Sequence, residues 1–203
     1  SYVYPEGITR VGLDDILYAG DLRYRIKLLG IARKENHKLD LRVHPALVPL
    51  QHPLAQINSS YNAVYLDTHP AGDLLFYGKG AGGMPTSSAV ISDIVRIALN
   101  EKSFFPQEEL VPLTPLEEVI GRYYIRCMSQ DKPGVLAHIA QILAQHQISI
   151  ASVTQKQGRK GKFVPIVLVT HQVKEQNVTR ALSQIDKLVE IKKPSQRIRI
   201  VDL

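Results

Sequence analysis

The sequence predicts an α+β protein with two structured regions and a connector between them. In the second region, apolar residues at strand spacing and at helix spacing alternate in the order βαββαβ. The first region mixes helical and strand patterns in a different order. Between the two, residues 101–121 hold three prolines and several glutamates, a composition typical of a connector. We therefore expect a mixed α/β region over 1–100, a linker over 101–121 and a second domain over 122–203.

The first region opens with a helix and two strands. Residues 12–22 predict the helix, because their apolar residues recur at helical spacing and two aspartates lie near the N-terminus, where the helix dipole favours negative charge. Residues 23–34 and 38–48 predict strands. We expect the second strand to stop at Pro45, since proline cannot donate a backbone hydrogen bond.

A hairpin and a second helix come next. Strands over 61–68 and 72–80 are joined by the turn sequence HPAG. Residues 87–100 predict a helix whose apolar face consists of Val90, Ile94, Ile97 and Ala98. The expected caps are Thr86, Ser87 or Ser88 at its start and Asn100 at its end.

The second domain has clearer patterns than the first. Its expected elements are strand 123–129, helix 135–147, strands 148–155 and 163–171, helix 174–188 and the extended segments VEI and RIRIVDL. This order is that of a ferredoxin-like split unit, in which two helices cover one face of an antiparallel sheet. A unit of this size is marginally stable alone, so we expect a second copy to bury its open face or edge.

Composition limits the classes of function. The chain has 203 residues, of which 44% are hydrophobic and 22% charged, as is ordinary for a globular protein. The net charge of +6 is scattered, and the basic segments 155–162 and 190–199 lack the interleaved aromatic residues of a base-stacking surface, so we expect no nucleic-acid partner. No window is apolar enough for a membrane span. The single cysteine, Cys127, excludes an intramolecular disulfide, and we expect a cytoplasmic protein.

A glycine-rich segment after the hairpin raises the question of nucleotide binding. Gly78, Gly80 and Gly83 fit the pattern G-x-G-x-x-G. A dinucleotide-binding turn needs a further strand about 20 residues on that ends in an acidic residue, and the segment after Asn100 has too few apolar residues for one. Two interpretations remain: a backbone without Cβ atoms that a flat or anionic ligand can approach, or a tight turn that begins a helix.

A second candidate is the turn QDKPG before the helix that begins near residue 135. Pro133 suits the first helical position, and Asp131 can cap the free amides. The same amides could instead bind the carboxylate of a ligand. The seven histidines have no metal-binding spacing, and no nucleophile elbow or Walker A lysine occurs, so the residues alone propose no catalysis.

Longer blocks of the sequence resemble a known family. The segments EGITRVGLDDILYAGDLRYRIKLLGIA, RVHPALVPLQHPLAQINSSYNAVYL and GKGAGGMPTSSAVISDIVRIA are similar to consecutive blocks of homoserine dehydrogenase. From YYIRCMSQDKPGVLAHIAQILAQHQISIASVTQK to the C-terminus, the chain resembles an ACT domain. The blocks cover nearly the whole chain in the order of the family.

The resemblance to homoserine dehydrogenase implies a C-terminal portion of an enzyme that interconverts L-homoserine and L-aspartate 4-semialdehyde with NADP or NAD. By that likeness the residues on the cofactor side are Gly80, Ala81, Gly82 and Thr86. The helix over 87–99 would pack on a Rossmann cofactor domain that precedes residue 1. The proton-transfer residues would also precede it, so we expect no catalytic residue and no activity in this chain alone.

The resemblance to ACT domains implies pairing into at least a dimer and binding of an amino-acid effector, with L-threonine as the leading candidate. The residues carried over to the effector site are Asp131, Gly134, Val135, Leu136, Ser149 and Ile150. Feedback would need a coupling free energy of about 1–3 kcal/mol between effector and active site, carried by the connector over 101–121. The alternatives are a non-enzymatic amino-acid sensor and, less favoured, an RNA-binding module of the same βαββαβ order.

Overall fold

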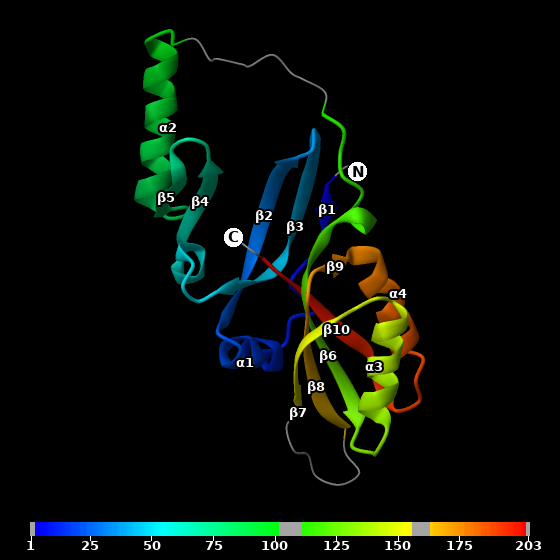
Figure 1. Ribbon diagram of the computed structural model, residues 1–203. Helices are drawn as coiled ribbons and strands as arrows, with labels where there is room; N and C mark the ends of the chain where they lie inside the picture. The colour runs from blue at the N-terminus through cyan, green and yellow to red at the C-terminus, as the bar shows by residue number, and fades with distance from the viewer. Residues whose placement is uncertain (1–2, 102–110, 156–162, 202–203) are drawn as a thin grey trace. The chain divides into compact units, whose positions relative to one another are not determined.

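The computed structural model describes residues 3–101, 111–155 and 163–201 (Figure 1). Among these, the residues of 1–50 and 111–203 form one compact unit, and those of 51–110 form a second. We call them the sheet unit and the hairpin unit. Segments from both ends of the chain therefore belong to one unit, a grouping that no local sequence pattern indicates.

The sheet unit contains most of the regular structure. Its elements are β1 (Tyr4–Pro5), α1 (Leu13–Asp21), β2 (Tyr24–Glu35), β3 (Lys38–Pro49), η2 (Leu116–Glu118), β6 (Ile120–Gln130), α3 (Val135–Gln145), β7 (Ile150–Gln155), β8 (Phe163–Thr170), β9 (Val173–Lys174), α4 (Glu175–Ile185) and β10 (Ile191–Ile200). The run β6-α3-β7-β8-α4-β10 has the predicted βαββαβ order, and the α+β class is confirmed.

One continuous sheet joins the two ends of the chain. The strands β10, β6, β8 and β7 lie side by side in that order, as in a ferredoxin-like unit. Arg199 and Ile200 of β10 pair in parallel with Ala46 and Leu47 of β3, and β3 pairs along its whole length with β2. Strand β3 therefore lies at this edge of the βαββαβ sheet.

The two faces of the sheet have separate cores. On the face with α3 and α4, Tyr123 and Cys127 of β6 are buried among apolar residues of both helices. On the opposite face, Ala19 of α1 packs with Tyr124 and Ile198. The neighbouring tyrosines of β6 belong to different cores because successive strand residues point to opposite faces. Helix α1 of the same chain thus packs on the face opposite to α3 and α4.

Two predicted boundaries are wrong. β3 does not stop at Pro45 but continues to Pro49. Pro45 lies between the residues that pair with β1 and those that pair with β10. At that position the missing backbone N–H of proline costs the sheet little. The second predicted helix begins at Gly83, with Gly82 and not a hydroxyl residue as its N-cap. Its first turn tolerates Pro85, since no backbone donor is needed there.

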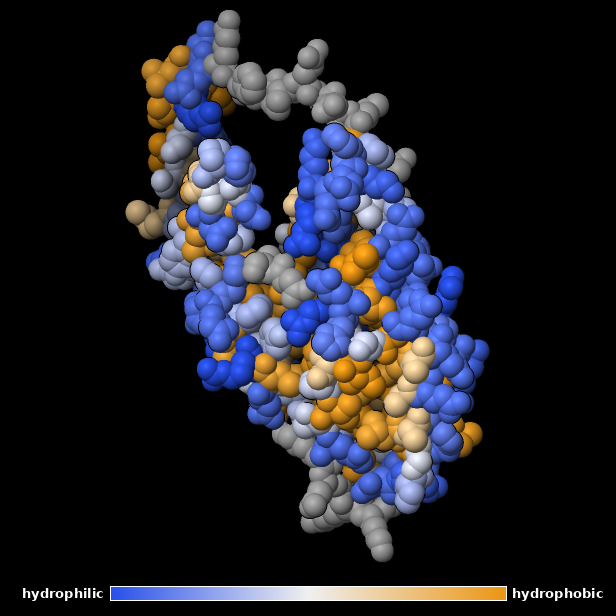
Figure 2. All heavy atoms as spheres, viewed as in Figure 1, coloured by the Kyte–Doolittle hydropathy of each residue, from blue (hydrophilic) through white to orange (hydrophobic). Residues whose placement is uncertain are grey.

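The hairpin unit is small. It consists of η1 (Pro53–Gln56), β4 (Tyr61–Thr68), β5 (Gly72–Lys79) and α2 (Gly83–Ala98). The predicted hairpin is confirmed: β4 and β5 pair antiparallel along their whole length, with Tyr61 and Tyr77 stacked at 4.7 Å between ring centroids. No residue of α2 is buried, and Figure 2 shows hydrophobic side chains on its surface.

Among the described helices, none has both the length and the hydropathy that a membrane-spanning helix needs.

Candidate functional site

The sheet unit has a pocket where β6 ends and α3 begins. Its volume is about 330 Å³, and its lining consists of Ser129, Gln130, Asp131, Lys132, Pro133, Gly134, Val135, Leu136, Gln155 and Ile166. We call it the turn pocket. Gln155 comes from β7 and Ile166 from β8. Strand β8 pairs antiparallel with both β6 and β7, so β6 and β7 are parallel and their C-terminal ends lie at the same end of the sheet.

The backbone of the turn leaves the start of α3 open. Gly134 is the N-cap residue and has a φ of 90°, a left-handed conformation that favours glycine. No side chain caps this helix, so Asp131 does not have the capping role that the sequence predicts. Val135 N–H donates to the carbonyl of Lys132 at 3.5 Å, so the next amides of the first turn, those of Leu136 and Ala137, and the positive end of the dipole are available to an anionic group.

The turn pocket combines groups of different chemistry. The helix N-terminus favours a negative charge, whereas the exposed carboxylate of Asp131 favours a positive one. Gln130 and Gln155 contribute side-chain amides, which both donate and accept hydrogen bonds. Val135 and Ile166 are buried and apolar. This set can bind a small ligand that carries both charges next to an apolar group.

The structure brings together four of the six residues expected at an effector site. Asp131, Gly134, Val135 and Leu136 all line the turn pocket. Ser149 and Ile150 do not line it: Ile150 pairs with Thr170, at the end of β7 opposite to the pocket, and the carbonyl of Ser149 accepts a hydrogen bond from His171 N–H. Their separation follows from the strand directions, because the start of β7 lies near the start of β6.

Sequence reasoning missed Gln155 and Ile166. The signal was present in the predicted topology, since in a βαββαβ sheet the second strand is parallel to the first and its last residue lies beside the first turn. The pocket lining also includes Ser129, whose hydroxyl donates to the carbonyl of Val164 at 3.4 Å.

The four residues expected on the cofactor side form the passage from β5 to α2. Gly80 N–H donates to the carbonyl of Ser60 at 3.0 Å, and Thr86 N–H donates to that of Gly82 at 3.1 Å. A Cβ on Gly80 would overlap the side chain of Asn62, and Gly82 has a φ of 122°. The φ of Gly82 favours glycine, whereas a side chain at position 80 would require the exposed side chain of Asn62 to move. The side chain of Asn62 is a neighbour of this segment that the sequence did not indicate.

A buried carboxylate links α1 to β6. Asp15 is fully buried and accepts hydrogen bonds from the Tyr124 hydroxyl at 3.0 Å and from Arg126 Nε at 2.6 Å and Nη2 at 3.0 Å. Gly12 N–H donates to its second oxygen at 3.0 Å. Burial and the nearby carboxylate of Asp15 raise the pKa of Tyr124, so this hydroxyl stays a donor. We call Asp15, Tyr124 and Arg126 the Asp15 cluster.

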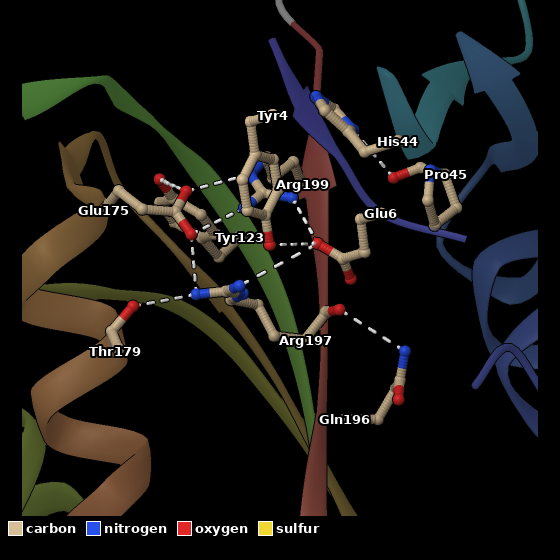
Figure 3. A network of polar contacts seen from close by, with 10 residues as sticks. All are labelled: Tyr4, Glu6, His44, Pro45, Tyr123, Glu175, Thr179, Gln196, Arg197 and Arg199. Atoms are coloured by element: carbon tan, nitrogen blue, oxygen red, sulfur yellow. Dashed lines mark hydrogen bonds and ion pairs between the residues drawn. The ribbon is translucent and has the colours of Figure 1, made fainter. Parts of the chain in front are cut away.

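A second cluster lies on the other face of the sheet (Figure 3). Arg199 donates to both oxygens of Glu175, at 2.8 and 2.7 Å, and to Glu6 at 2.7 Å. The hydroxyl of Tyr123 donates to Glu175 at 2.8 Å, and Arg197 pairs with the same carboxylate at 2.6 Å. Burial would raise the pKa of Glu175, but Arg199 and Arg197 hold it below the usual range of glutamate. We call these five residues the Glu175 cluster.

Two buried titratable groups have no catalytic partner. His44 donates from Nδ1 to the carbonyl of Pro45 at 3.0 Å, and its Nε2 has no partner. Burial lowers the pKa of His44 to about 4, and Arg199 and Arg42 add to this effect. Cys127 lies buried in the core, and this burial raises the pKa of its thiol to about 11. Over the described part of the chain, no group of three His, Cys, Asp or Glu side chains could hold a metal ion.

Two family models match the chain. The homoserine dehydrogenase model matches residues 1–95, and the ACT domain model matches residues 123–190. The homoserine dehydrogenases of Neisseria gonorrhoeae and Pseudomonas aeruginosa are each 38% identical to this chain, over 100% and 98% of its length. In both comparisons the chain covers 49% of the relative, so it spans about half the length of these curated relatives.

Solved structures agree with these matches. The crystal structure of a homoserine dehydrogenase from Thiobacillus denitrificans superposes with a TM-score of 0.87 at 39% identity, over 99% of this chain and 48% of that one. The S. aureus homoserine dehydrogenase at pH 6.0 superposes with a TM-score of 0.65 at 27% identity, over 100% and 48%. The chain therefore belongs to the homoserine dehydrogenase family and corresponds to a C-terminal portion of such an enzyme, with an ACT domain.

Proposed function

We propose that this chain is the regulatory and cofactor-side part of a homoserine dehydrogenase that interconverts L-homoserine and L-aspartate 4-semialdehyde with NAD or NADP. We further propose that its ACT domain binds an amino acid, L-threonine, in the turn pocket. The observation that carries the second proposal is the uncapped N-terminus of α3 beside the Asp131 carboxylate. Four of the residues expected from the ACT resemblance line this pocket.

The passage from β5 to α2 fits a nicotinamide cofactor. Gly80 and Gly82 present a backbone without Cβ atoms, and Ala81 adds only a methyl group. A nicotinamide cofactor held there would supply the hydride acceptor or donor. Gly80, Ala81, Gly82 and Thr86 would lie against the cofactor, at the N-terminus of a helix of 16 residues.

We assign no proton-transfer residue in this chain. Among the described residues, the buried carboxylates are Asp15 and Glu175, and both are held by arginine side chains, so neither is free to take a proton from a substrate. We therefore expect the chain alone to give no turnover of L-homoserine. Homo-oligomers of at least a dimer are part of the same proposal, since ACT domains pair with one another.

An amino acid matches the chemistry of the turn pocket. Its carboxylate would accept from the amides at the start of α3, and its ammonium group would lie against Asp131. The side chain would contact Val135 and Ile166. A side-chain hydroxyl, as in threonine, would need a polar partner, and Gln155 is the side-chain amide that β7 brings to the pocket.

Calorimetric titration and thermal unfolding of the chain with L-threonine test this proposal, with L-homoserine, L-methionine and L-lysine as comparisons. At 100 times its dissociation constant, a ligand bound only by the folded state adds about 2.7 kcal/mol to the free energy of unfolding. We expect a rise in Tm that is selective for threonine. Asp131→Asn should lower the affinity for threonine about tenfold or more, because the substitution removes the charge opposite the ammonium group. The matched control is Asp93→Asn, which neutralises an exposed aspartate of α2.

Binding that Asp131→Asn leaves unchanged would place the ligand elsewhere. No heat and no change in Tm with any of the four amino acids at millimolar concentration would contradict the effector proposal.

A further inference from the structure

β6 takes part in two features of the sheet unit. Its last residues, Ser129 and Gln130, line the turn pocket. Its central residues, Tyr124 and Arg126, bind Asp15 of α1. One strand therefore connects the pocket to a helix that is distant in sequence.

The contact between β6 and α1 is stiff. Asp15 accepts four hydrogen bonds, one from Gly12 at the start of α1, one from Tyr124 and two from Arg126. The side chain of Arg126 is 15% exposed and that of Asp15 is 0% exposed. Separating the two would leave a charge without a partner in a buried place, which is strongly unfavourable. A shift of β6 must therefore move α1 or break this cluster.

The connector offers a weaker link between the same parts of the chain. Thr114 N–H donates to the carbonyl of Leu39 at 3.0 Å, Leu39 N–H donates to that of Pro112 at 2.9 Å, and Lys38 pairs with Glu118 at 3.5 Å. Both side chains of this ion pair are about half exposed, at 47% and 55%. Exposed pairs are screened by water and contribute little. The hydroxyl of Tyr123 on β6 donates to Glu175 in the Glu175 cluster.

We infer that β6 and the Asp15 cluster, not the connector, transmit ligand binding at the turn pocket to α1. Asp15 belongs to the segment that matches homoserine dehydrogenase, and Arg126 belongs to the segment that matches the ACT domain. The cluster is thus a buried, charged contact between the two family segments. This inference rests on the proposed effector site, because a ligand in the turn pocket is its input.

The physical route has three steps. A ligand that binds the amides of α3 and the side chain of Gln130 restrains the end of β6. Restraint of β6 restrains the guanidinium of Arg126, and the two hydrogen bonds of Arg126 to Asp15 restrain α1. Because coupling is reciprocal, loosening α1 also changes the affinity of the pocket.

The test is amide hydrogen exchange of the whole chain, measured by mass spectrometry with and without saturating L-threonine. Peptides over 131–137 report binding itself, and peptides over 13–21 report the response of α1. In the wild type we expect exchange to slow about fivefold or more in both. In Arg126→Met we expect the response over 131–137 to remain and the response over 13–21 to disappear.

A pair of adjacent tyrosines gives a matched control. Tyr124→Phe removes one hydrogen bond to Asp15 and leaves the ion pair, so it should weaken the response of α1 in a chain that still folds. Tyr123→Phe removes the equivalent hydroxyl bond to Glu175 on the other face and should leave that response unchanged. Lys38→Met, which breaks the ion pair to the connector, should also leave it unchanged.

Three results would overturn the inference. Protection over 131–137 without any over 13–21 in the wild type would refute the coupling and leave the effector proposal standing. A response of α1 that survives Arg126→Met and Tyr124→Phe but is lost in Lys38→Met would assign the route to the connector. Absence of protection over 131–137 would refute the effector proposal, and with it this inference.

Discussion

The sheet unit and the hairpin unit contain helices with similar sequence patterns and opposite burial. Both α3 and α2 have an apolar face at helical spacing, yet Val135, Ile139 and Leu143 of α3 are buried whereas no residue of α2 is. In the sheet unit, segments more than a hundred residues apart in sequence cover each other. Apolar periodicity thus predicts that a helix has a face to bury, but it does not predict what covers that face. An apolar helix face that is this exposed is typical of an interaction surface.

The largest difference between the units should come from their ion pairs. Arg199→Met removes one of the two arginine partners of the buried Glu175 and should lower the free energy of unfolding by up to about 3–5 kcal/mol, because Arg197 and Tyr123 then satisfy the buried carboxylate only in part. The matched change in the hairpin unit is Arg96→Met, which breaks an exposed pair with Glu101 and should cost about 0–1 kcal/mol. Urea unfolding measures both. Equal effects would contradict the described burial of the Glu175 cluster.

A smaller contrast is expected between apolar side chains on the two helices. Leu143→Ala creates a cavity in a fully buried site and should destabilise the chain by about 2–5 kcal/mol. Ile94→Ala shortens a side chain that is 59% exposed, and surface changes of this kind stay within about 0.5 kcal/mol. Thermal unfolding of the two variants checks this. A cost of Ile94→Ala similar to that of Leu143→Ala would show that α2 is covered in solution, for example by a second copy.

The smallest of these effects depends on pH and concerns only the sheet unit. The pKa of His44 is about 4 in the folded chain, against 6.5 when exposed. As the pH falls from 6.5 to 4, the unfolded state therefore binds a proton before the folded state does, and stability falls by up to about 3 kcal/mol across this window. His44→Asn should flatten the curve of stability against pH there. An unchanged slope in this variant would contradict the burial of neutral His44 between Arg199 and Arg42.

Glu175 acts in a lower pH window. Its pKa is held below the usual value of 4.5, so its stabilising effect is complete above that value and is lost as the pH falls through the lower, folded pKa. The slope between pH 6.5 and 4.5 therefore reports His44 and not Glu175.

The elements could be predicted from the sequence because they depend on nearby residues. The periods of 3.6 and 2 located α1, α3, α4 and the β4–β5 hairpin, and the turn QDKPG predicted the start of a helix. Asp15 was interpreted only as a favourable charge near a helix N-terminus. Its partner Arg126 lies 111 positions further along the chain, and nothing in either neighbourhood indicates the other.

The same limit applies to the residues expected at the effector site. Ser149 and Ile150 were carried over by resemblance, but the direction of β7 places Gln155, not these two, at the turn pocket. The pairing of β3 with β10 was not predicted because it joins positions about 150 residues apart in sequence and involves few residues. Such pairing depends on tertiary contacts, which a local pattern does not contain.

Native-state hydrogen exchange in increasing denaturant tests most directly the claim that both ends of the chain form one unit. The amides of β3 should exchange with the same free energy of opening as those of β6 and β8, since one sheet and two buried clusters join them. The amides of β4, β5 and α2 should exchange with a lower free energy. If β3 instead opens separately from β6 and together with the hairpin unit, the first half of the chain is an independent domain and this account of the fold is wrong.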